Sequence, residues 1–470
     1  MTVIAINPAT EEVLAEFPEA TPQEIDQALD ETARGHLAWR ATPYAKRRAA
    51  MERVARYLRD NRTHLAALIT AEMGKPIVEA EGEIDKCAWS CDFVAMEAET
   101  WLADRQVETG GRRSYVSFRP LGTILAIMPW NFPFWQVFRF GAPSLMAGNA
   151  TLVKHAPNVP QCALAIEETF RAAGLPDGVY RNCFIPVPLV DTVIRDARIH
   201  GVTVTGSVPT GAKVASESGR AIKKTVLELG GSDPFIVLED ADLEEAARTA
   251  VRARNQNSGQ SCIASKRFII VDAVAAEFER RFTEAVSALK LGDPSSRETN
   301  MGPLARGDLR DHLAEQVERS VAQGARVLAG GRRLEGRGFY YEPTVLDGVT
   351  REMPAFREET FGPAAAIIRV RDAQEAIAVA NDTLYGLGAS LWTRDLDRAA
   401  LLAASIDAGS VFVNAIVASD PRLPFGGIKQ SGFGRELSEF GLHEFVNMQS
   451  TWMRLPGDQP GPQPPAPRST

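Results

Sequence analysis

The sequence predicts an α/β protein with two doubly wound parallel-sheet domains. Short apolar stretches typical of buried strands alternate with helical segments twice, first from Leu121 to about residue 220 and again from Pro234 to about residue 414. Strands that alternate with helices form parallel sheets covered by helices on both faces, and ligands bind beyond the carboxyl ends of such strands. The length of 470 residues is sufficient for two or three domains.

The first hundred residues are expected to be mostly helical. Thr21-Pro22-Gln23-Glu24 has the features of a helix start, with a threonine cap, a proline at the first helical position and a glutamate three residues after the cap. Amphipathic helices are expected over about residues 44–59, 63–73 and 78–102. Ser114–Arg119 then alternates apolar and polar residues, which predicts a half-exposed strand.

Each of the two α/β series has its own expected elements. In the first, we expect strands at Ile124–Met128, Ala150–Lys154, Asn182–Val187 and Gly201–Thr205, separated by helices near Gln136–Met146, Pro160–Ala173 and Thr210–Ser218. In the second, we expect strands at Pro234–Leu238, Arg267–Val271, Ala364–Val370, Ala389–Trp392 and Ser410–Asn414, with helices near Leu243–Arg254, Glu375–Ala380 and Leu396–Ser405.

Composition excludes several classes of protein. The net charge of −8 argues against a nucleic-acid partner, and no apolar run is long enough to span a membrane. The N-terminus shows no export signal, and five sparse cysteines indicate a reducing compartment, so we expect a cytoplasmic protein. Cys87 and Cys91 are expected to pack on one helix face, and no metal site is expected because the histidines are scattered singly.

Cys262 is the first candidate for a catalytic side chain. It lies in the stretch Asn255–Ala264, among small and amide-bearing residues, between a helical run and an apolar strand. Small neighbours leave room for an electrophile, and free backbone N–H groups can stabilise negative charge. The alternative is a small buried residue of the core, which is the usual role of an unpaired cysteine.

Glu228 and Asn131 are the other two candidates. Glu228 lies between two leucines and before two glycines, and an apolar environment raises the pKa of a carboxyl group into the range of a general base. Asn131 lies between prolines and aromatic residues, which predicts a rigid amide donor for an oxyanion. The alternatives are an edge-strand glutamate that faces water and a turn asparagine bonded to its own backbone.

Together these stretches resemble the signatures of the aldehyde dehydrogenase superfamily. The family's glutamate signature is similar to Leu227–Gly231, its cysteine signature to Gly259–Cys262, and its Pro-Trp-Asn-Phe-Pro segment to Pro129–Pro133. The three occur in the family's order and spacing, and the resemblance extends from about residue 5 to residue 455. It implies that Cys262 attacks an aldehyde, that Asn131 and the Cys262 N–H hold the oxyanion, and that Glu228 activates water to hydrolyse the thioester.

The resemblance also implies a nicotinamide cofactor, NAD or NADP. No Gly-x-Gly-x-x-Gly motif occurs, and the loop from Gly206 to Lys213 has Ala212 where a P-loop needs lysine. The implied cofactor-binding residues are Pro129, Trp130, Lys154, Pro157, Gly206, Ser207, Gly211, Leu229, Gly230, Glu359 and Phe361. Many NAD-dependent members have glutamate and some NADP-dependent members serine at the place of Pro157, so both cofactors are expected.

The substrate is expected to be an aldehyde that carries a carboxylate. Arg139 and Ser419 match positions found in succinate-semialdehyde dehydrogenases, the subgroup that this chain resembles, and a guanidinium can hold a carboxylate in bidentate fashion. The implied substrate-binding residues are Trp135, Arg139, Gln256, Ser261, Ser419 and Phe425. Several members have arginine where this chain has Gln256, so glutarate semialdehyde or another aldehyde is a competing substrate. Ile263-Ala264 lacks the partner cysteine of a redox switch.

Two further functions remain alternatives, an acyl-CoA-forming enzyme and a non-catalytic binding protein with the same fold. The expected domains are a dinucleotide-binding domain (residues 1–108 and 121–231) and a catalytic domain (residues 232–441). A small β oligomerisation arm (residues 109–120 and 442–455) is expected to join a homodimer or homotetramer. The tail, residues 456–470, contains six prolines and is expected to be disordered.

Overall fold

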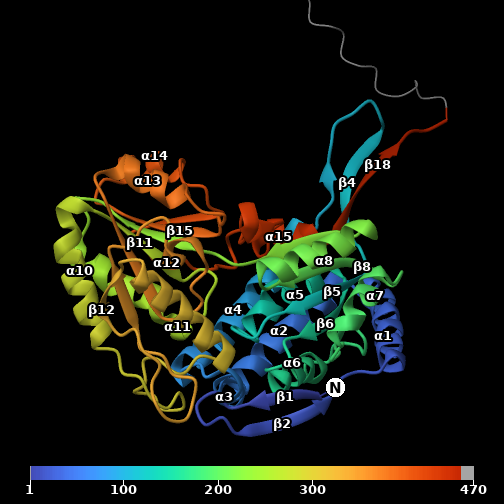
Figure 1. The fold of residues 1–470 in the computed structure, drawn as a ribbon. Helices are drawn as coiled ribbons and strands as arrows, with labels where there is room; N and C mark the ends of the chain where they lie inside the picture. The colour runs from blue at the N-terminus through green and yellow to red at the C-terminus, as the bar shows by residue number, and fades with distance from the viewer. Residues whose placement is uncertain (1, 457–470) are drawn as a thin grey trace, which may run out of the picture.

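The computed structural model describes residues 2–456 and contains two parallel-sheet units and a projecting arm. Figure 1 shows the N-terminal unit in blue and green on one side and the second unit in yellow and orange on the other. The predicted α/β fold class, with two sheets built from alternating strands and helices, is confirmed. The proline-rich tail lies outside the described residues, apart from Pro456.

The N-terminal segment is a hairpin followed by four helices. The hairpin is formed by β1 (Thr2–Ile6) and β2 (Val13–Pro18), and the helices are α1 (Pro22–Arg40), α2 (Tyr44–Asp60), α3 (Arg62–Met73) and α4 (Ile77–Trp101). The predicted start of α1 is confirmed. The backbone N–H of Thr21 donates to the Glu24 carboxylate at 2.7 Å, and the Thr21 hydroxyl accepts from the Glu24 N–H at 3.2 Å.

The first sheet has six strands in the order β17-β9-β8-β5-β6-β7. They are β5 (Thr123–Met128), β6 (Ala150–His155), β7 (Tyr180–Asn182), β8 (Ile199–Thr205), β9 (Lys224–Glu228) and β17 (Gly432–Phe433). The helices of this unit are α5 (Trp135–Ala147), α6 (Pro160–Ala172), α7 (Val190–Arg195) and α8 (Val208–Arg220). The strands β5 to β9 are parallel, so Met128, Thr205 and Glu228 end at the same edge of the sheet.

One expectation for this sheet differs from the structure. The strand expected at Asn182–Val187 is instead β7 at Tyr180–Asn182, because Pro186 and Pro188 have no N–H to donate to a neighbouring strand. The short strand β17, which was not predicted from the sequence, pairs antiparallel with β9, with Gly432 opposite Glu228. The chain therefore returns to the first sheet after completing the second.

The second sheet has seven strands in the order β12-β13-β14-β11-β10-β15-β16, parallel except for β12. They are β10 (Asp233–Val237), β11 (Ser265–Val271), β12 (Arg326–Ala329), β13 (Thr344–Asp347), β14 (Ala364–Val370), β15 (Gly388–Trp392) and β16 (Ser410–Val413). The helices of this unit are α9 (Leu243–Asn255), α10 (Asp272–Ser287), α11 (Gly307–Ala322), α12 (Pro354–Arg357), α13 (Ala373–Asn381) and α14 (Leu396–Ala403).

The arm is a three-stranded antiparallel sheet in the order β18-β4-β3 that projects from the body (Figure 1). It consists of β3 (Arg105–Gln106), β4 (Arg113–Pro120) and β18 (Val446–Met453), and β18 follows the short helix α15 (Ser438–Glu444). Pairing runs from Val446 opposite Pro120 to Met453 opposite Arg113. Within residues 2–456, no helix combines the length and apolar character needed to cross a membrane.

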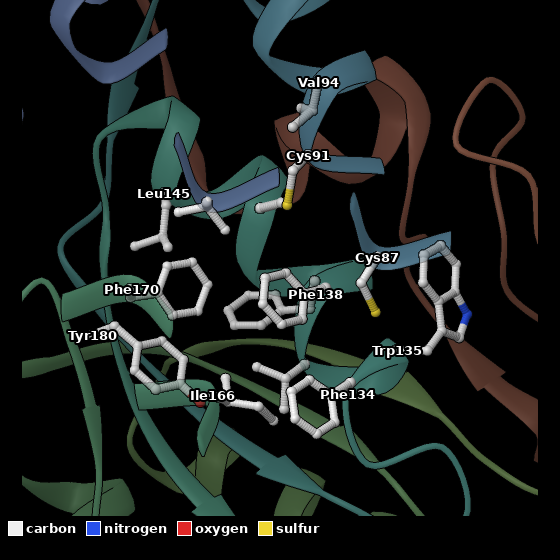
Figure 2. Close-up of a cluster of buried hydrophobic side chains, with 14 of the residues drawn as sticks. Cys87, Cys91, Val94, Phe134, Trp135, Phe138, Leu145, Ile166, Phe170 and Tyr180 are labelled. Carbon is white, nitrogen blue, oxygen red and sulfur yellow. The ribbon is translucent and has the colours of Figure 1, made fainter. Parts of the chain in front are cut away.

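A stack of aromatic rings anchors α5, which leads into the site. The ring of Phe138 lies 5.1 Å from that of Phe170, which in turn lies 4.6 Å from Tyr180 (Figure 2). Cys87 and Cys91, on neighbouring turns of α4, pack beside Phe138 and are fully buried, as predicted. The position of α5 is therefore set by contacts with α4, α6 and β7.

Replacing Phe138 with alanine should destabilise the protein by about 3 to 5 kcal/mol, because the buried ring would leave a cavity between three elements. Denaturant unfolding followed by tryptophan fluorescence measures the change. Phe433→Ala is the matched control, since that ring is 51% exposed and its loss should cost less than about 1 kcal/mol. Equal effects of the two substitutions would contradict the packing role of Phe138.

Candidate active site

Cys262 follows a loop with an unusual backbone conformation. Helix α9 ends at Asn255, and Asn257, Ser258 and Gly259 then have φ values of 55°, 52° and 74°. A non-glycine residue in this left-handed region costs of order 1–3 kcal/mol and persists only where its surroundings hold it. A Cβ on Gly259 would lie 2.4 Å from the carbonyl carbon of Gly362, so only glycine fits there.

Hydrogen bonds to neighbouring segments hold this loop. The Asn257 side-chain amide donates to the carbonyl oxygens of Asn131 at 2.8 Å and Gln260 at 3.0 Å. The hydroxyl of Ser258 donates to the Gly302 carbonyl at 3.0 Å. On the helix side, the guanidinium of Arg254 donates to the Gly259 carbonyl at 2.6 Å. The backbone before Cys262 is therefore fixed from both units of the fold.

Lys266, at the start of β11, holds the backbone on the other side of Cys262. Its fully buried ammonium donates to the carbonyl oxygens of Ser261 at 3.1 Å, Cys262 at 2.9 Å and Ala264 at 3.0 Å. Burial lowers the pKa of Lys266, while Glu359, with a carboxylate oxygen 3.9 Å from the ammonium, favours its charged form. All three ammonium hydrogens are therefore donated to backbone carbonyl groups of residues 261–264.

Asn131 and the backbone of Cys262 form the donor pair predicted for an oxyanion. The Asn131 amide nitrogen donates one hydrogen to the Gln260 carbonyl at 3.0 Å, which orients the amide beside the loop and leaves a second hydrogen for a ligand. Within the described part of the chain, the N–H of Cys262 has no acceptor. The oxyanion role of both groups remains a prediction.

Glu228 lies at the carboxyl end of β9, 2% exposed, and neither of its carboxylate oxygens has a hydrogen-bond partner among the described residues. Burial raises its pKa well above the ordinary value, because desolvation disfavours the charged carboxylate. A Cβ on Gly426 would lie 2.6 Å from one of its oxygens, so this glycine leaves the space that the carboxyl group occupies.

Two cavities meet at Cys262. A cavity of about 400 Å³ is lined by all six residues predicted to bind substrate, namely Trp135, Arg139, Gln256, Ser261, Ser419 and Phe425. A second cavity of about 580 Å³ lies at the carboxyl ends of the first sheet's strands and contains Asn131 and Glu228. Among the residues that the structure describes, only Cys262 and Gln136 line both cavities. The thiol therefore faces one cavity on each side.

The second cavity has the features of a dinucleotide site. It is lined by eight predicted cofactor residues, Pro129, Trp130, Gly206, Ser207, Leu229, Gly230, Glu359 and Phe361, and by the start of α8, whose first N–H groups suit a phosphate. Gly230 lets Glu359 approach, because a Cβ there would lie 2.3 Å from a carboxylate oxygen, and Glu359 accepts from the Gly231 N–H at 2.9 Å. The donor set therefore fits a dinucleotide.

Three predicted cofactor residues lie outside this cavity. Lys154, in β6, and Pro157, just after that strand, do not line it. The N–H of Gly211 donates to the Ser207 carbonyl at 2.9 Å, and a Cβ at Gly211 would lie 2.4 Å from Leu229. Gly211 thus allows α8 to pack closely against Leu229, and its contact with a cofactor remains a prediction.

Comparison with known proteins agrees with this arrangement. Residues 1–451 match the aldehyde dehydrogenase family. The chain belongs to the aldehyde dehydrogenase family. It is 51% identical over 449 residues to succinate semialdehyde dehydrogenase [NAD(P)+] of Escherichia coli, covering 96% of this chain and 97% of the relative. It is 44% identical over 457 residues to succinate-semialdehyde dehydrogenase [NADP(+)] of Mycobacterium avium, covering 96% and 97%.

A solved structure of the family has the same fold over almost the whole chain. The crystal structure of succinic semialdehyde dehydrogenase from Streptococcus pyogenes in complex with NADP+ superimposes with a TM-score of 0.94. It is 38% identical and covers 96% of this chain and 100% of its own. The aldehyde dehydrogenase fold predicted from the sequence is therefore confirmed.

The charge of Arg139 is engaged within the protein. Its buried guanidinium pairs with the carboxylate of Glu436, donates to the Thr205 hydroxyl at 3.4 Å and lies 4.4 Å from the centroid of the Phe425 ring. The sequence indicated an arginine among aromatic residues, but the partner, 297 positions away, carried no local signal. Whether Arg139 also binds a substrate carboxylate remains a prediction.

Two other functional side chains were missed from the sequence. Lys266 stands in an otherwise apolar strand, and a lysine in a fully buried strand is itself a signal for a specific role. Lys86, on α4, lines the cavity of predicted substrate residues. Its helix position gives no signal, because a lysine on an amphipathic helix is ordinarily solvated.

The Cys262 thiol should react slowly with iodoacetamide at pH 7.5 and faster as the pH rises. Burial raises its pKa to about 11, although the charges of Arg139 and Lys266 oppose this shift. Only the thiolate reacts, so the alkylation rate should increase about tenfold per pH unit up to about that value. Mass spectrometry measures modification of Cys262, and the four buried cysteines serve as internal controls. A rate that is level between pH 7 and 9 would contradict the raised pKa.

Proposed function

We propose that this aldehyde dehydrogenase oxidises succinate semialdehyde, or a closely similar carboxylate-bearing aldehyde, to the dicarboxylic acid with NAD or NADP. The observation that carries the proposal is the position of Cys262 between the two cavities. A substrate in the first cavity and a dinucleotide in the second would both adjoin the sulfur. The names of the relatives in E. coli and M. avium support the choice of substrate.

The residues of the site account for the formation of a thioester. The Cys262 sulfur bonds to the aldehyde carbon, and its thiol proton, which the raised pKa keeps on the free thiol, passes to water. The carbonyl oxygen becomes an oxyanion, for which the free Asn131 amide hydrogen and the Cys262 N–H are available. NAD(P), when held by the residues that line the second cavity, would serve as the acceptor of the hydride that the substrate carbon loses. The acyl group then remains on sulfur as a thioester.

Glu228 is the proposed general base for hydrolysis. It takes a proton from water, the water oxygen bonds to the acyl carbon, and the carbon–sulfur bond breaks to release the acid and the thiolate. Because burial raises the pKa of Glu228, the carboxyl group is protonated below that value and becomes a base only above it. Hydrolysis of the thioester should therefore accelerate with rising pH.

The cavity beside Cys262 suits a short substrate with a polar end. Trp135, Phe425 and Ser419 line it. The aromatic side chains can pack against a carbon chain, and the serine hydroxyl can donate a hydrogen bond to a terminal carboxylate. Lys154 and Pro157 are proposed to contact the adenosine end of the cofactor, where Pro157 discriminates against neither NAD nor NADP.

The arm is proposed to join the subunits of a homodimer or homotetramer. Met448 and Met453 of β18 are 57% and 42% exposed, and Figure 1 shows the arm extending away from the body. Exposed apolar residues on a projecting sheet favour burial against another chain.

All five cysteines are free thiols, which supports a reducing, cytoplasmic location.

The substrate is tested by measuring reduced-cofactor formation with succinate semialdehyde, glutarate semialdehyde and butanal, each with NAD and with NADP. Butanal has the four-carbon chain without the carboxylate. We expect kcat/KM for succinate semialdehyde to exceed that for butanal by at least about tenfold, since a hydrogen bond to a charged group is worth about 1.5 to 3 kcal/mol. Equal values would overturn the substrate, and a preference for glutarate semialdehyde would assign the longer one. Cys262→Ala is the inactive control.

Glu228→Gln should form one equivalent of reduced cofactor per active site and then stop. The amide has nearly the shape of the carboxyl group but cannot take a proton, so the thioester on Cys262 would accumulate. Rapid mixing measures the burst, and mass spectrometry after acid quenching identifies the acyl group on Cys262. Continued turnover by Glu228→Gln at the rate of the unmodified enzyme would contradict the role of Glu228.

A further inference from the structure

We propose that Lys86 of α4 provides the positive charge that binds the substrate's carboxylate, acting together with the hydroxyl of Ser419. The inference rests on the proposed function, because it concerns how that substrate is recognised. It assigns the role to a residue that neither the motifs nor the spacing of the sequence indicated. We reach this assignment by comparing the charged groups that line the substrate cavity and asking which of them already have partners within the protein.

The other buried charges of this cavity are engaged. Five charged residues line it, Glu79, Glu83, Lys86, Arg139 and Arg252. Arg139 pairs with Glu436, so part of its charge is neutralised by a carboxylate of the protein. Arg252 is exposed, and its charge is screened by water. Neither arginine therefore provides a positive charge that is both unpaired and shielded from water inside the cavity.

The two carboxylates of the cavity are held away from a ligand by other donors. Glu83 pairs with the buried ammonium of Lys75 and accepts the N–H groups of Phe134 and Trp135, both at 2.9 Å. Glu79 accepts the N–H of Asn257 at 2.7 Å. Neither carboxylate lies within 4.0 Å of the Lys86 ammonium, and the same holds for every other carboxylate of residues 2–456. Lys86 therefore keeps its charge for a ligand.

Lys86 is also held in place. Its ammonium donates one hydrogen to the Ser419 hydroxyl oxygen at 2.7 Å and lies 4.3 Å from the centroid of the Trp135 ring. An ammonium has three hydrogens, so two remain available after the bond to Ser419. Trp135 itself is fixed at the start of α5, beside the buried aromatic cluster (Figure 2). The cation is thus pre-positioned rather than free on a flexible chain.

The hydroxyl of Ser419 completes the carboxylate site. It accepts from the Lys86 ammonium and from the indole N–H of Trp135 at 3.1 Å, and both of these groups are donors only. The two lone pairs of the oxygen are therefore occupied, and its own hydrogen has no acceptor within the described chain. A carboxylate is acceptor-only when ionised, so it complements the remaining hydrogens of Lys86 and Ser419, whereas a methyl group does not.

The pH dependence of binding should follow the charge of Lys86. Burial lowers its pKa to about 8, and the charge of Arg139 acts in the same direction. The carboxyl groups of Glu83 and Asp420 and the thiol of Cys87 act in the opposite direction. The ammonium is charged below its pKa and neutral above it, so the KM for succinate semialdehyde should rise above about pH 8. The KM for butanal should not follow this change.

The test compares succinate semialdehyde with butanal in the full-length enzyme and in Lys86→Met, which keeps the length of the side chain without its charge. For succinate semialdehyde, we expect kcat/KM to fall by about 10- to 100-fold, mainly through KM, because charge-assisted hydrogen bonds to the carboxylate are lost. For butanal, kcat/KM should stay within about threefold, which also shows that the variant is folded. Lys86→Arg should recover part of the loss.

Arg252→Gln is the matched control, since it removes the same charge from the rim of the same cavity. It should lower kcat/KM for succinate semialdehyde by less than about threefold. Three results would overturn the role of Lys86 while the proposed function stands. Lys86→Met could keep the preference for succinate semialdehyde, or it could lower kcat/KM equally for both substrates. Arg252→Gln could also cause the larger loss of kcat/KM for succinate semialdehyde. If the unmodified enzyme does not prefer succinate semialdehyde over butanal, both fail together.

Discussion

The position of the Cys262 sulfur depends on the left-handed backbone of residues 257–259. Three consecutive residues in this conformation turn the chain sharply between the end of α9 and the start of β11. Such a turn is unfavourable alone, and two fully buried side chains hold the backbone around it, Arg254 at the carbonyl of Gly259 and Lys266 at the carbonyl of Cys262. The geometry of the site therefore relies on two buried cations that do not line either cavity.

The same use of buried charge shapes the substrate cavity. Lys75 pairs with Glu83 beneath α5, and Arg139 pairs with Glu436 across the cavity wall. Each pair neutralises charge close to the cavity, and the pair of Arg139 and Glu436 also joins segments 297 positions apart in the sequence. Removing one partner of such a pair leaves a buried charge without compensation, which costs more than the pair itself contributes. These ion pairs fix the side chains that line the cavity, and in our proposal the ammonium of Lys86 binds the substrate's carboxylate.

Local sequence patterns predicted most of the fold. The strands that surround the site and the capped start of α1 are encoded by nearby residues, because hydrophobic period and capping are short-range effects. The strand expected at Asn182–Val187 was wrong because two prolines interrupt a run that is otherwise apolar. The strand β17 was not predicted, because a two-residue strand shows no hydrophobic alternation in the sequence.

The sequence indicated candidate site residues where they belong to motifs and missed those that do not. Cys262, Asn131 and Glu228 stand in recognisable stretches, and the structure brings them to neighbouring walls. Lys86 and Glu436 act through contacts with residues about 300 positions away, so their environment could not be inferred from their neighbours in the chain. Gly211 shows the reverse case, where a motif residue is explained by packing against Leu229.

The return of the chain at Gly432–Phe433 has a consequence for biosynthesis. The edge of the first sheet at β9, which carries Glu228, is covered only when β17 arrives. Glu436, which neutralises Arg139, belongs to the same late segment. During translation, the sheet edge at β9 and the guanidinium of Arg139 lack these partners until residues 432–436 have been synthesised, so the first unit cannot complete its native contacts before nearly the whole chain exists.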